Sequence, residues 1–216
     1  MNKSFAVIGL GRFGRSVAIE LSKLGAEVMV IDNDEEKINH VADYVTCAMN
    51  IDVRDHEALK NSGISNMDAV IVAMSESLEP SIMSVITAKD LGVPKVLAKA
   101  KDTVSGEILS KVGADTILYP EKESGRRISR RLMSNDFLDY FELSDTVSLV
   151  ELMPKEEWVG KSLRSLDLRK NYRINVVAIK ENEDVRVVMD PDEPLKPGCP
   201  LLCTIKAVDL KKLVGR

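Results

Sequence analysis

Short runs of apolar residues recur along the first half of the chain, and polar segments with a helical pattern separate them. The six runs are Phe5–Ile8, a run ending at Asp32, Tyr44–Met49, Met67–Met74, Lys95–Lys99 and Thr116–Tyr119. Continuous apolar strands are typical of parallel sheets that are covered on both faces. Strands that alternate with helices favour a right-handed, doubly wound arrangement. We therefore predict a Rossmann-like α/β domain with a parallel sheet over residues 1–120.

The pattern changes after Pro120. Residues 121–134 have helical periodicity, and three aromatic residues follow within the segment Phe137–Phe141. Such a concentration of aromatics predicts a segment that packs against a neighbour, in this chain or in another. We interpret residues 121–144 as a crossover helix with a connector. The stretch from Pro120 to Phe141 is our candidate for an element that couples the first domain to a neighbour.

Residues 145–216 have the pattern of a second, smaller domain. Alternation of apolar and polar residues predicts strands at Thr146–Met153, Ile174–Ile179, Val185–Met189 and Leu201–Ile205, and a closing helix at Ala207–Val214. A turn-rich section over residues 190–198 precedes the last strand. We predict a small α+β domain here.

Composition and charge exclude several classes of protein. The net charge of −4 argues against a nucleic-acid binder, although the helix after Pro120 carries Arg126, Arg127, Arg130 and Arg131. We interpret that basic face as a solvated or inter-subunit surface. No apolar run approaches the roughly 20 residues that span a bilayer. The first residues lead directly into a strand, so we predict no signal peptide and a cytosolic protein.

The three cysteines do not suggest a disulfide framework or a metal site. Their number is odd, and Cys199 and Cys203 lie in an apolar segment without further metal ligands nearby. We expect all three, Cys47 included, to be buried small apolar residues.

The candidate chemistry lies in the glycine motif GLGRFG, between the first strand and the first helix. Gly9 allows the tight turn, Gly11 lets the backbone approach a pyrophosphate, and Gly14 lets the helix pack closely on the strand. The N-terminus of the helix directs unpaired N–H groups and its dipole towards phosphates. Asp32 ends the second strand, where a carboxylate can accept hydrogen bonds from both ribose hydroxyls. The motif predicts a nucleotide site.

The residues after the second and third strands bear on the kind of nucleotide. Asn33 is followed by three acidic residues without a nearby arginine, which disfavours the 2′-phosphate of NADP. Asp52 has two possible roles that spacing alone does not separate. It can reach the adenine side of a nucleotide, or it can cap a helix predicted over Arg54–Lys60.

An NAD-dependent oxidoreductase is the obvious alternative for such a motif, but the sequence offers it little chemistry. Hydride transfer requires a positioned acid–base residue and a site that holds the substrate. The only histidines, His40 and His56, fall on the adenosine half of the predicted fold. We therefore favour a non-catalytic sensor that responds to differential binding of two ligands in one pocket.

Several segments together resemble one known family. They are GLGRFG, VID at 30–32, the NID segment around Asp52, AKA at 98–100 and GADTILYPEKESG. With the C-terminal domain, they are similar to the regulatory subunits of TrkA/KtrA-type potassium uptake systems, which are RCK (regulator of potassium conductance) proteins. The resemblance covers nearly the whole chain.

The resemblance implies a cytosolic subunit that forms dimers, which assemble into a ring, usually an octamer. This ring docks on a separate membrane subunit that translocates potassium. ATP favours the conducting state and ADP the resting state, and some relatives bind NAD(H).

The resemblance also assigns residues. Gly9, Gly11 and Gly14 lie under the phosphates, and Arg12 reaches the phosphates, often across a dimer interface. Asp32 holds the ribose, Asp52 lies near the adenine, Lys99 lies near the phosphates, and Glu121 binds Mg²⁺ or Ca²⁺. The remaining candidates for nucleotide contact are Phe13, Asn33 and Ala73. Arg15 departs from relatives that have a small residue there.

Part of the family resembles a receptor for cyclic di-AMP in its C-terminal domain. The matching residues here are Arg169, Arg173, Asn175 and Val176. Arginines and a backbone edge suit phosphates and bases, although two arginines beside a strand are a common arrangement.

Overall fold

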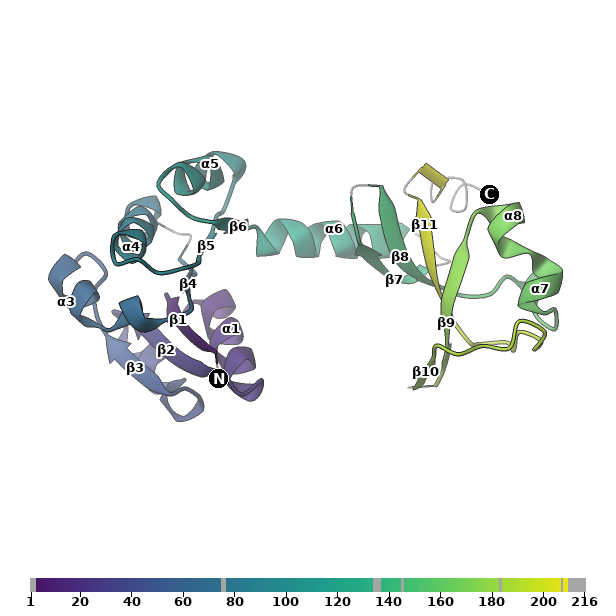
Figure 1. Cartoon of the computed structure of the whole chain (residues 1–216), viewed down its shortest axis with the longest axis horizontal. Helices are drawn as coiled ribbons and strands as arrows, with labels where there is room; N and C mark the ends of the chain where they lie inside the picture. Colours follow the sequence, from purple (N-terminus) through teal and green to yellow (C-terminus); the bar gives the residue numbers. More distant parts are fainter. Residues whose placement is uncertain are drawn as a thin grey trace. The chain divides into compact units, whose positions relative to one another are not determined.

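A computed structural model describes residues 3–74, 77–133, 137–144, 146–182, 184–206 and 208–209, without the side chains of 130, 131, 133, 137–140 and 142. The chain divides into two compact units, residues 1–122 and residues 123–216. Each unit has its own sheet (Figure 1). The hydrophobic clusters of one unit are separate from those of the other.

The first unit is built on a parallel sheet of six strands in the order β3-β2-β1-β4-β5-β6. The strands are β1 (Ser4–Ile8), β2 (Glu27–Asp32), β3 (Cys47–Asn50), β4 (Ala69–Val72), β5 (Val96–Lys99) and β6 (Thr116–Leu118). The order reverses between β1 and β4, which both pair with neighbours in parallel. This is the Rossmann-like arrangement that the sequence predicted. In such sheets, ligands bind at the carboxyl ends of the strands beside the reversal.

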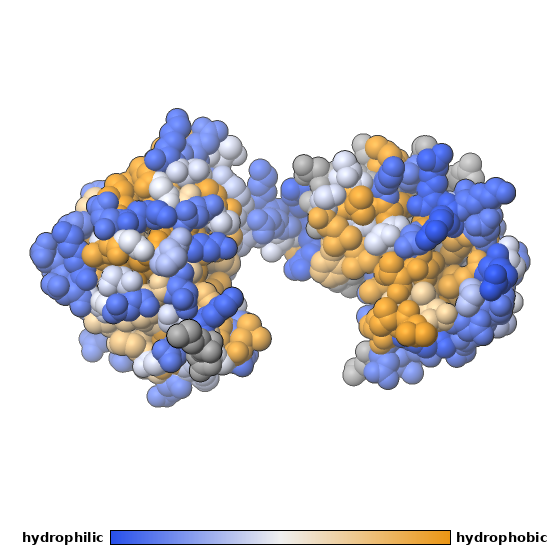
Figure 2. All heavy atoms as spheres, in the orientation of Figure 1, coloured by the Kyte–Doolittle hydropathy of each residue, from blue (hydrophilic) through white to orange (hydrophobic). Residues whose placement is uncertain are grey.

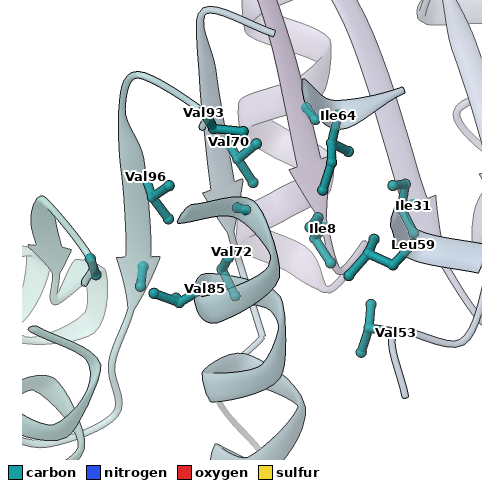
Figure 3. Close-up of a cluster of buried hydrophobic side chains, with 14 of the residues drawn as sticks. Ile8, Ile31, Val53, Leu59, Ile64, Val70, Val72, Val85, Val93 and Val96 are labelled. Atoms are coloured by element: carbon teal, nitrogen blue, oxygen red, sulfur yellow. The ribbon is translucent and has the colours of Figure 1, made fainter. Parts of the chain in front are cut away.

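Helices cover both faces of this sheet. They are α1 (Arg12–Lys23), α2 (Glu35–Asn39), α3 (His56–Asn61), α4 (Leu78–Asp90) and α5 (Thr103–Lys111), with short 3₁₀ turns η1 (Ala42–Tyr44) and η2 (Ile64–Asn66). Figure 3 shows one core, in which Ile8 and Val72 of the sheet face Leu59 of α3 and Val85 of α4. The other core places Val7 and Val30 with residues of α1 and α2, including Ala18 and Ile38. Alternate residues of β1 therefore enter different cores, which explains its continuous apolar sequence.

The third strand begins later than its apolar pattern predicted. Tyr44 belongs to η1, where its N–H donates to the carbonyl of Val41, and its side chain is exposed. Pairing with β2 starts only at Cys47. The local turn, rather than the apolar character of Tyr44 and Val45, decides the boundary.

Helix α6 (Pro120–Met133) begins in the first unit and continues into the second. The second unit is an antiparallel sheet in the order β10-β9-β11-β8-β7. Its elements are β7 (Phe137–Glu142), β8 (Val147–Leu152), η3 (Glu156–Trp158), α7 (Leu163–Leu166), α8 (Leu168–Tyr172), β9 (Asn175–Glu181), β10 (Asp184–Arg186) and β11 (Leu201–Lys206). Trp158, only 1% exposed, lies in its core with Leu152, Ile174 and Leu201. This unit is the small α+β domain that the pattern predicted.

Two predictions in the second unit need correction. The aromatic segment associates with a neighbour in the same chain, as expected, but as strand β7 paired with β8 rather than as a connector. The strand predicted at Val185–Met189 is shorter, because β10 ends at Arg186 and Val187 and Val188 are exposed. Of the predicted closing helix, the structure describes only Val208 and Asp209, which are helical. The rest of it lies outside the described residues.

The three cysteines differ in their burial. Cys203 is fully buried in β11, whereas Cys47 and Cys199 are partly exposed, and all three are free thiols. Burial raises the pKa of the Cys203 thiol to about 12. The expectation of complete burial was therefore wrong for Cys47 and Cys199.

Among the described residues, no helix is both long and apolar enough to cross a membrane. Figure 2 shows charged and apolar residues interspersed on the visible face of the first unit, and broader apolar areas on that of the second.

Candidate functional site

An open groove of about 1020 Å³ lies at the carboxyl ends of the strands of the first unit. It is at the edge of the sheet where β1 and β4 meet, as expected for this topology. Every nucleotide-contact candidate from the sequence lines it except Gly14. The lining also includes residues that the sequence did not single out: Leu10, Ile31, Lys37, Ile51, Val53, Arg54, Met74, Ser77 and Pro80. Arg15 lines it as well.

The glycine loop has the geometry that its motif predicted. Gly9 has φ of +94°, a conformation that favours glycine, and its N–H donates to the carbonyl of Ile31 over 2.8 Å. Gly14 lies against this turn, because an added Cβ would collide with the carbonyl oxygen of Gly9 and lie 2.9 Å from Cβ of Ala73. A Cβ at Gly11 would meet no protein atom within 4 Å. The protein therefore leaves the space beside Gly11 open.

Asp32 connects this loop to the residues that follow β2. Its Oδ2 accepts a hydrogen bond from the Leu10 N–H at 2.6 Å, and its Oδ1 accepts one from the Asp34 N–H at 3.0 Å. The residue is only 9% exposed. Each oxygen keeps further lone-pair capacity, so a ribose hydroxyl can still donate to it. The carboxylate therefore fixes the loop in addition to the ribose role that the motif suggests.

A lysine that sequence reasoning missed lies beside this carboxylate. Nζ of Lys37 is 3.8 Å from Oδ1 of Asp32 and 3.3 Å from Oδ2 of Asp34. Asp34 caps α2 by accepting from the N–H groups of Glu36 and Lys37. The hydrogen bond from the Lys37 ammonium, helped by that residue's backbone N–H, lowers the pKa of the Asp34 carboxyl. The helical i, i+3 spacing of Asp34 and Lys37 was the available signal.

The structure excludes one of the two roles left open for Asp52. Asp55, not Asp52, caps α3, since its Oδ1 accepts from the Ala58 N–H at 3.0 Å. Asp52 accepts from the Arg54 N–H, lies 3.6 Å from that guanidinium, and lines the groove. The helix-cap role was therefore wrong. With Lys37, Arg54 adds a second cation to the groove lining.

The opposite end of the groove is cationic. Arg12 is the first residue of α1, Arg15 follows one turn later, and both are exposed. The first turn of α1 has no acidic residue, and its cap residue Gly11 offers no side-chain bond to the helix N–H groups. These open N–H groups and two guanidinium groups suit an anion.

Lys99 and Glu121 form an ion pair at the same end. Nζ of Lys99 lies 2.7 Å from Oε1 of Glu121, and it lies 5.7 Å from the centre of the Phe13 ring. The hydrogen bond from Lys99 lowers the pKa of the Glu121 carboxyl, and the charge of Arg12 adds to this effect. Glu121 is therefore ionised at neutral pH. Sequence spacing did not predict this pair, because β5 and the start of α6 are brought together only by the fold.

A metal site made by protein alone is not found among the described residues, which contain no group of three or more His, Cys, Asp or Glu side chains suited to one. A cation bound by Glu121 would need further oxygen ligands from outside these residues, such as phosphate oxygens or water. The two histidines lie outside the groove lining. His40 ends α2, and His56 pairs through Nδ1 with Oγ1 of Thr87 at 2.9 Å.

The second-messenger candidates lie together at the junction of α8 and β9. Arg169 donates through Nη2 to Oδ1 of Asn175 at 2.5 Å, and both arginines are exposed. Arg173 has a left-handed backbone with φ of +58° and precedes β9, where Asn175 and Val176 are partly buried. The structure thus brings all four residues to one surface region.

Comparison with known proteins extends over both units. The TrkA-N domain family matches residues 5–120, and the TrkA-C domain family matches residues 147–214. Ktr system potassium uptake protein C of Bacillus subtilis (strain 168) is 45% identical over 187 residues, covering 87% of this chain and 85% of that protein. Ktr system potassium uptake protein A of the same organism is 36% identical over 211 residues, covering 98% and 95%.

Solved structures share the fold at lower identity. The GsuK channel bound to NAD matches with a TM-score of 0.69 at 15% identity, covering all of this chain and 40% of that chain. The GsuK RCK domain matches with a TM-score of 0.66 at 16% identity, covering all of this chain and 48% of that one. At such identity these matches describe the fold alone.

Proposed function

The chain belongs to the TrkA family, which includes the Trk and Ktr potassium uptake proteins, and we propose that it is a nucleotide-sensing regulatory subunit. In this proposal, it gates a separate membrane subunit that translocates potassium. The observation that carries the proposal is the groove, with a ribose-type acid at one end and a cationic cluster at the other. No histidine lines the groove to serve as an acid–base group.

ATP and ADP are the ligands we assign to the groove, with NAD(H) as a further possibility. Asp32 would hold the ribose and Asp52 would lie near the adenine. The N-terminus of α1, Arg12 and Lys99 would contact phosphates, and the additional charge of a third phosphate would favour the side with the guanidinium groups. ATP is proposed to favour the conducting state, and ADP the resting state.

Glu121 is the proposed protein ligand for a divalent cation, Mg²⁺ or Ca²⁺. A carboxylate with phosphate oxygens supplies the hard oxygen ligands that these ions prefer. The cation would then bridge the nucleotide and the start of α6.

The proposed assembly is a homodimer that builds a ring, in which Arg12 reaches the phosphates of a neighbouring protomer. An octamer is the ring size we propose, located at the cytoplasmic face of the membrane through its partner subunit. Exposed apolar residues of the second unit, such as Val187 and Val188, are available for contacts within such a ring.

Cyclic di-AMP is the proposed ligand of the second unit, at Arg169, Arg173, Asn175 and Val176. The two exposed arginines would provide charge for its phosphates. The adjacent residues Asn175 and Val176 would provide polar side-chain and backbone groups for its bases.

Binding calorimetry with ATP, ADP, NADH and NADPH tests this function on the full chain. We expect both ATP and ADP to bind. Tight NADH binding with turnover of the nicotinamide would instead show an NAD-dependent oxidoreductase and refute the sensor.

A further inference from the structure

The phosphate end of the groove already contains an anion that belongs to the protein. Lys99 is paired with Glu121 over 2.7 Å, and the two side chains differ in exposure, 11% for Lys99 and 70% for Glu121. Lys99 is therefore fixed by its surroundings, including the ring of Phe13. The carboxylate of Glu121 can turn into solvent at little cost in packing.

The charges around Glu121 are those that nucleotide phosphates would need. Arg12 and Lys99 both line the groove with Glu121, and Lys99 is paired with it. An anionic ligand that reaches these cations must share them with the carboxylate or displace it. Because an ion pair with an exposed partner is worth little, a phosphate with several oxygens can compete with it successfully.

We propose that the carboxylate of Glu121 competes with a nucleotide phosphate for the ammonium group of Lys99. This proposal rests on the proposed nucleotide-binding function of the groove. In the nucleotide-free protein, Glu121 holds Lys99. When a phosphate binds, Lys99 changes partner and the carboxylate is released. The released carboxylate is then available to a divalent cation, which offsets the lost ion pair.

The exchange makes the response depend on nucleotide and cation together. Without a divalent cation, the phosphate must break the Lys99–Glu121 pair and leave an unpaired carboxylate nearby. With the cation, the same carboxylate contributes to binding. Glu121 is the second residue of α6, so its release takes place at the start of the helix that leads out of the first unit.

Simple repulsion between Glu121 and the phosphates is the competing explanation. It requires only the negative charge and does not involve Lys99. Two variants separate the explanations. Glu121→Asp keeps the charge but shortens the side chain by one methylene, and Glu121→Gln removes the charge.

The test measures ATP affinity by calorimetry in EDTA, with the full chain and with variants whose melting curves show that they fold. Both Glu121→Gln and Glu121→Asp should bind ATP about two- to fivefold more tightly than the native chain, as expected for loss of a partly exposed ion pair. In a Lys99→Met background, neither change should tighten binding, because there is no pair to break. Adenosine, which has no phosphate, should bind all of them alike.

Glu123→Gln is the matched control, since Glu123 is exposed on the same helix and does not line the groove. It should leave ATP affinity unchanged. Addition of Mg²⁺ should reverse the order, so that the native chain binds ATP more tightly than Glu121→Gln.

Three results would overturn the proposal. The first is an ATP affinity of Glu121→Gln in EDTA that equals that of the native chain. The second is tighter ATP binding by Glu121→Gln but not by Glu121→Asp. The third is tighter ATP binding by either variant in the Lys99→Met background. Failure of the native chain to bind either ATP or ADP would instead refute the proposed function itself.

Discussion

The two glycines at positions 11 and 14 should respond differently to substitution by alanine, one by losing stability and the other by losing nucleotide affinity. Both belong to one loop, three residues apart, but the structure gives them different neighbours. A Cβ at Gly14 would collide with the carbonyl oxygen of Gly9 and lie 3.1 Å from its carbonyl carbon. A Cβ at Gly11 would meet no protein atom within 4 Å, and the backbone there has an ordinary φ of −61°.

The cost at Gly14 follows from these contacts. The atoms in the way are backbone and Ala73 Cβ, so no flexible side chain can move aside, and α1 must shift away from β1. Overpacking of this kind costs typically about 1–3 kcal/mol. Alanine regains up to about 1 kcal/mol of helix propensity at a position inside α1. We expect Gly14→Ala to lower the melting temperature by several degrees, at about 2–4 °C per kcal/mol for a chain of this size.

Gly11→Ala should behave differently. Its stability should change by less than about 1 kcal/mol, because only the helix-cap preference is affected. Its ATP and ADP affinities should nevertheless fall by about tenfold or more, since the added methyl group occupies the space where a pyrophosphate approaches the backbone.

Thermal melting and calorimetry on the same preparations provide the two readouts. Gly125→Ala on α6, where an added Cβ also meets nothing within 4 Å, controls for the general effect of replacing a helical glycine. If Gly11→Ala bound nucleotides like the native chain, the placement of the phosphates beside Gly11 would be wrong. If Gly14→Ala were as stable as the native chain, the inferred close contact of α1 with the loop would be wrong.

Three further predictions concern other residues. Asp32→Ala should weaken ATP, ADP and NADH by similar factors in calorimetry, because the carboxylate would contact the ribose that they share, and a selective loss of ATP would contradict this role. Arg12→Ala should remove the preference for ATP over ADP, and an unchanged affinity ratio would refute its contact with the terminal phosphate. Cys203 should react with iodoacetamide far more slowly than Cys47 and Cys199 at pH 8, as measured by mass spectrometry, because burial raises its thiol pKa to about 12.

Much of the first unit was predictable from sequence because its signals are local. Continuous apolar runs mark strands that enter cores on both faces of the sheet, as β1 does through Ile8 and Val7. The glycine loop was equally predictable, since the backbone of the turn itself requires glycine at Gly9 and Gly14.

The contacts that the sequence missed are formed by the fold. Lys99 and Glu121 are 22 positions apart, and only the placement of β5 beside the start of α6 pairs them. The aromatic segment that becomes β7 was interpreted as a connector, because its strand pairing with β8 depends on a partner rather than on its own alternation. Asp52 and Asp55 are both plausible caps by residue type, and only the position of the first turn of α3 distinguishes them.

The proposed regulation is tested most directly by potassium flux through a membrane partner reconstituted with this chain in liposomes. The account predicts a larger flux with ATP than with ADP, and no difference between the nucleotides for Arg12→Ala. Equal flux with ATP, with ADP and without nucleotide, from a chain that calorimetry shows to be saturated, would contradict it.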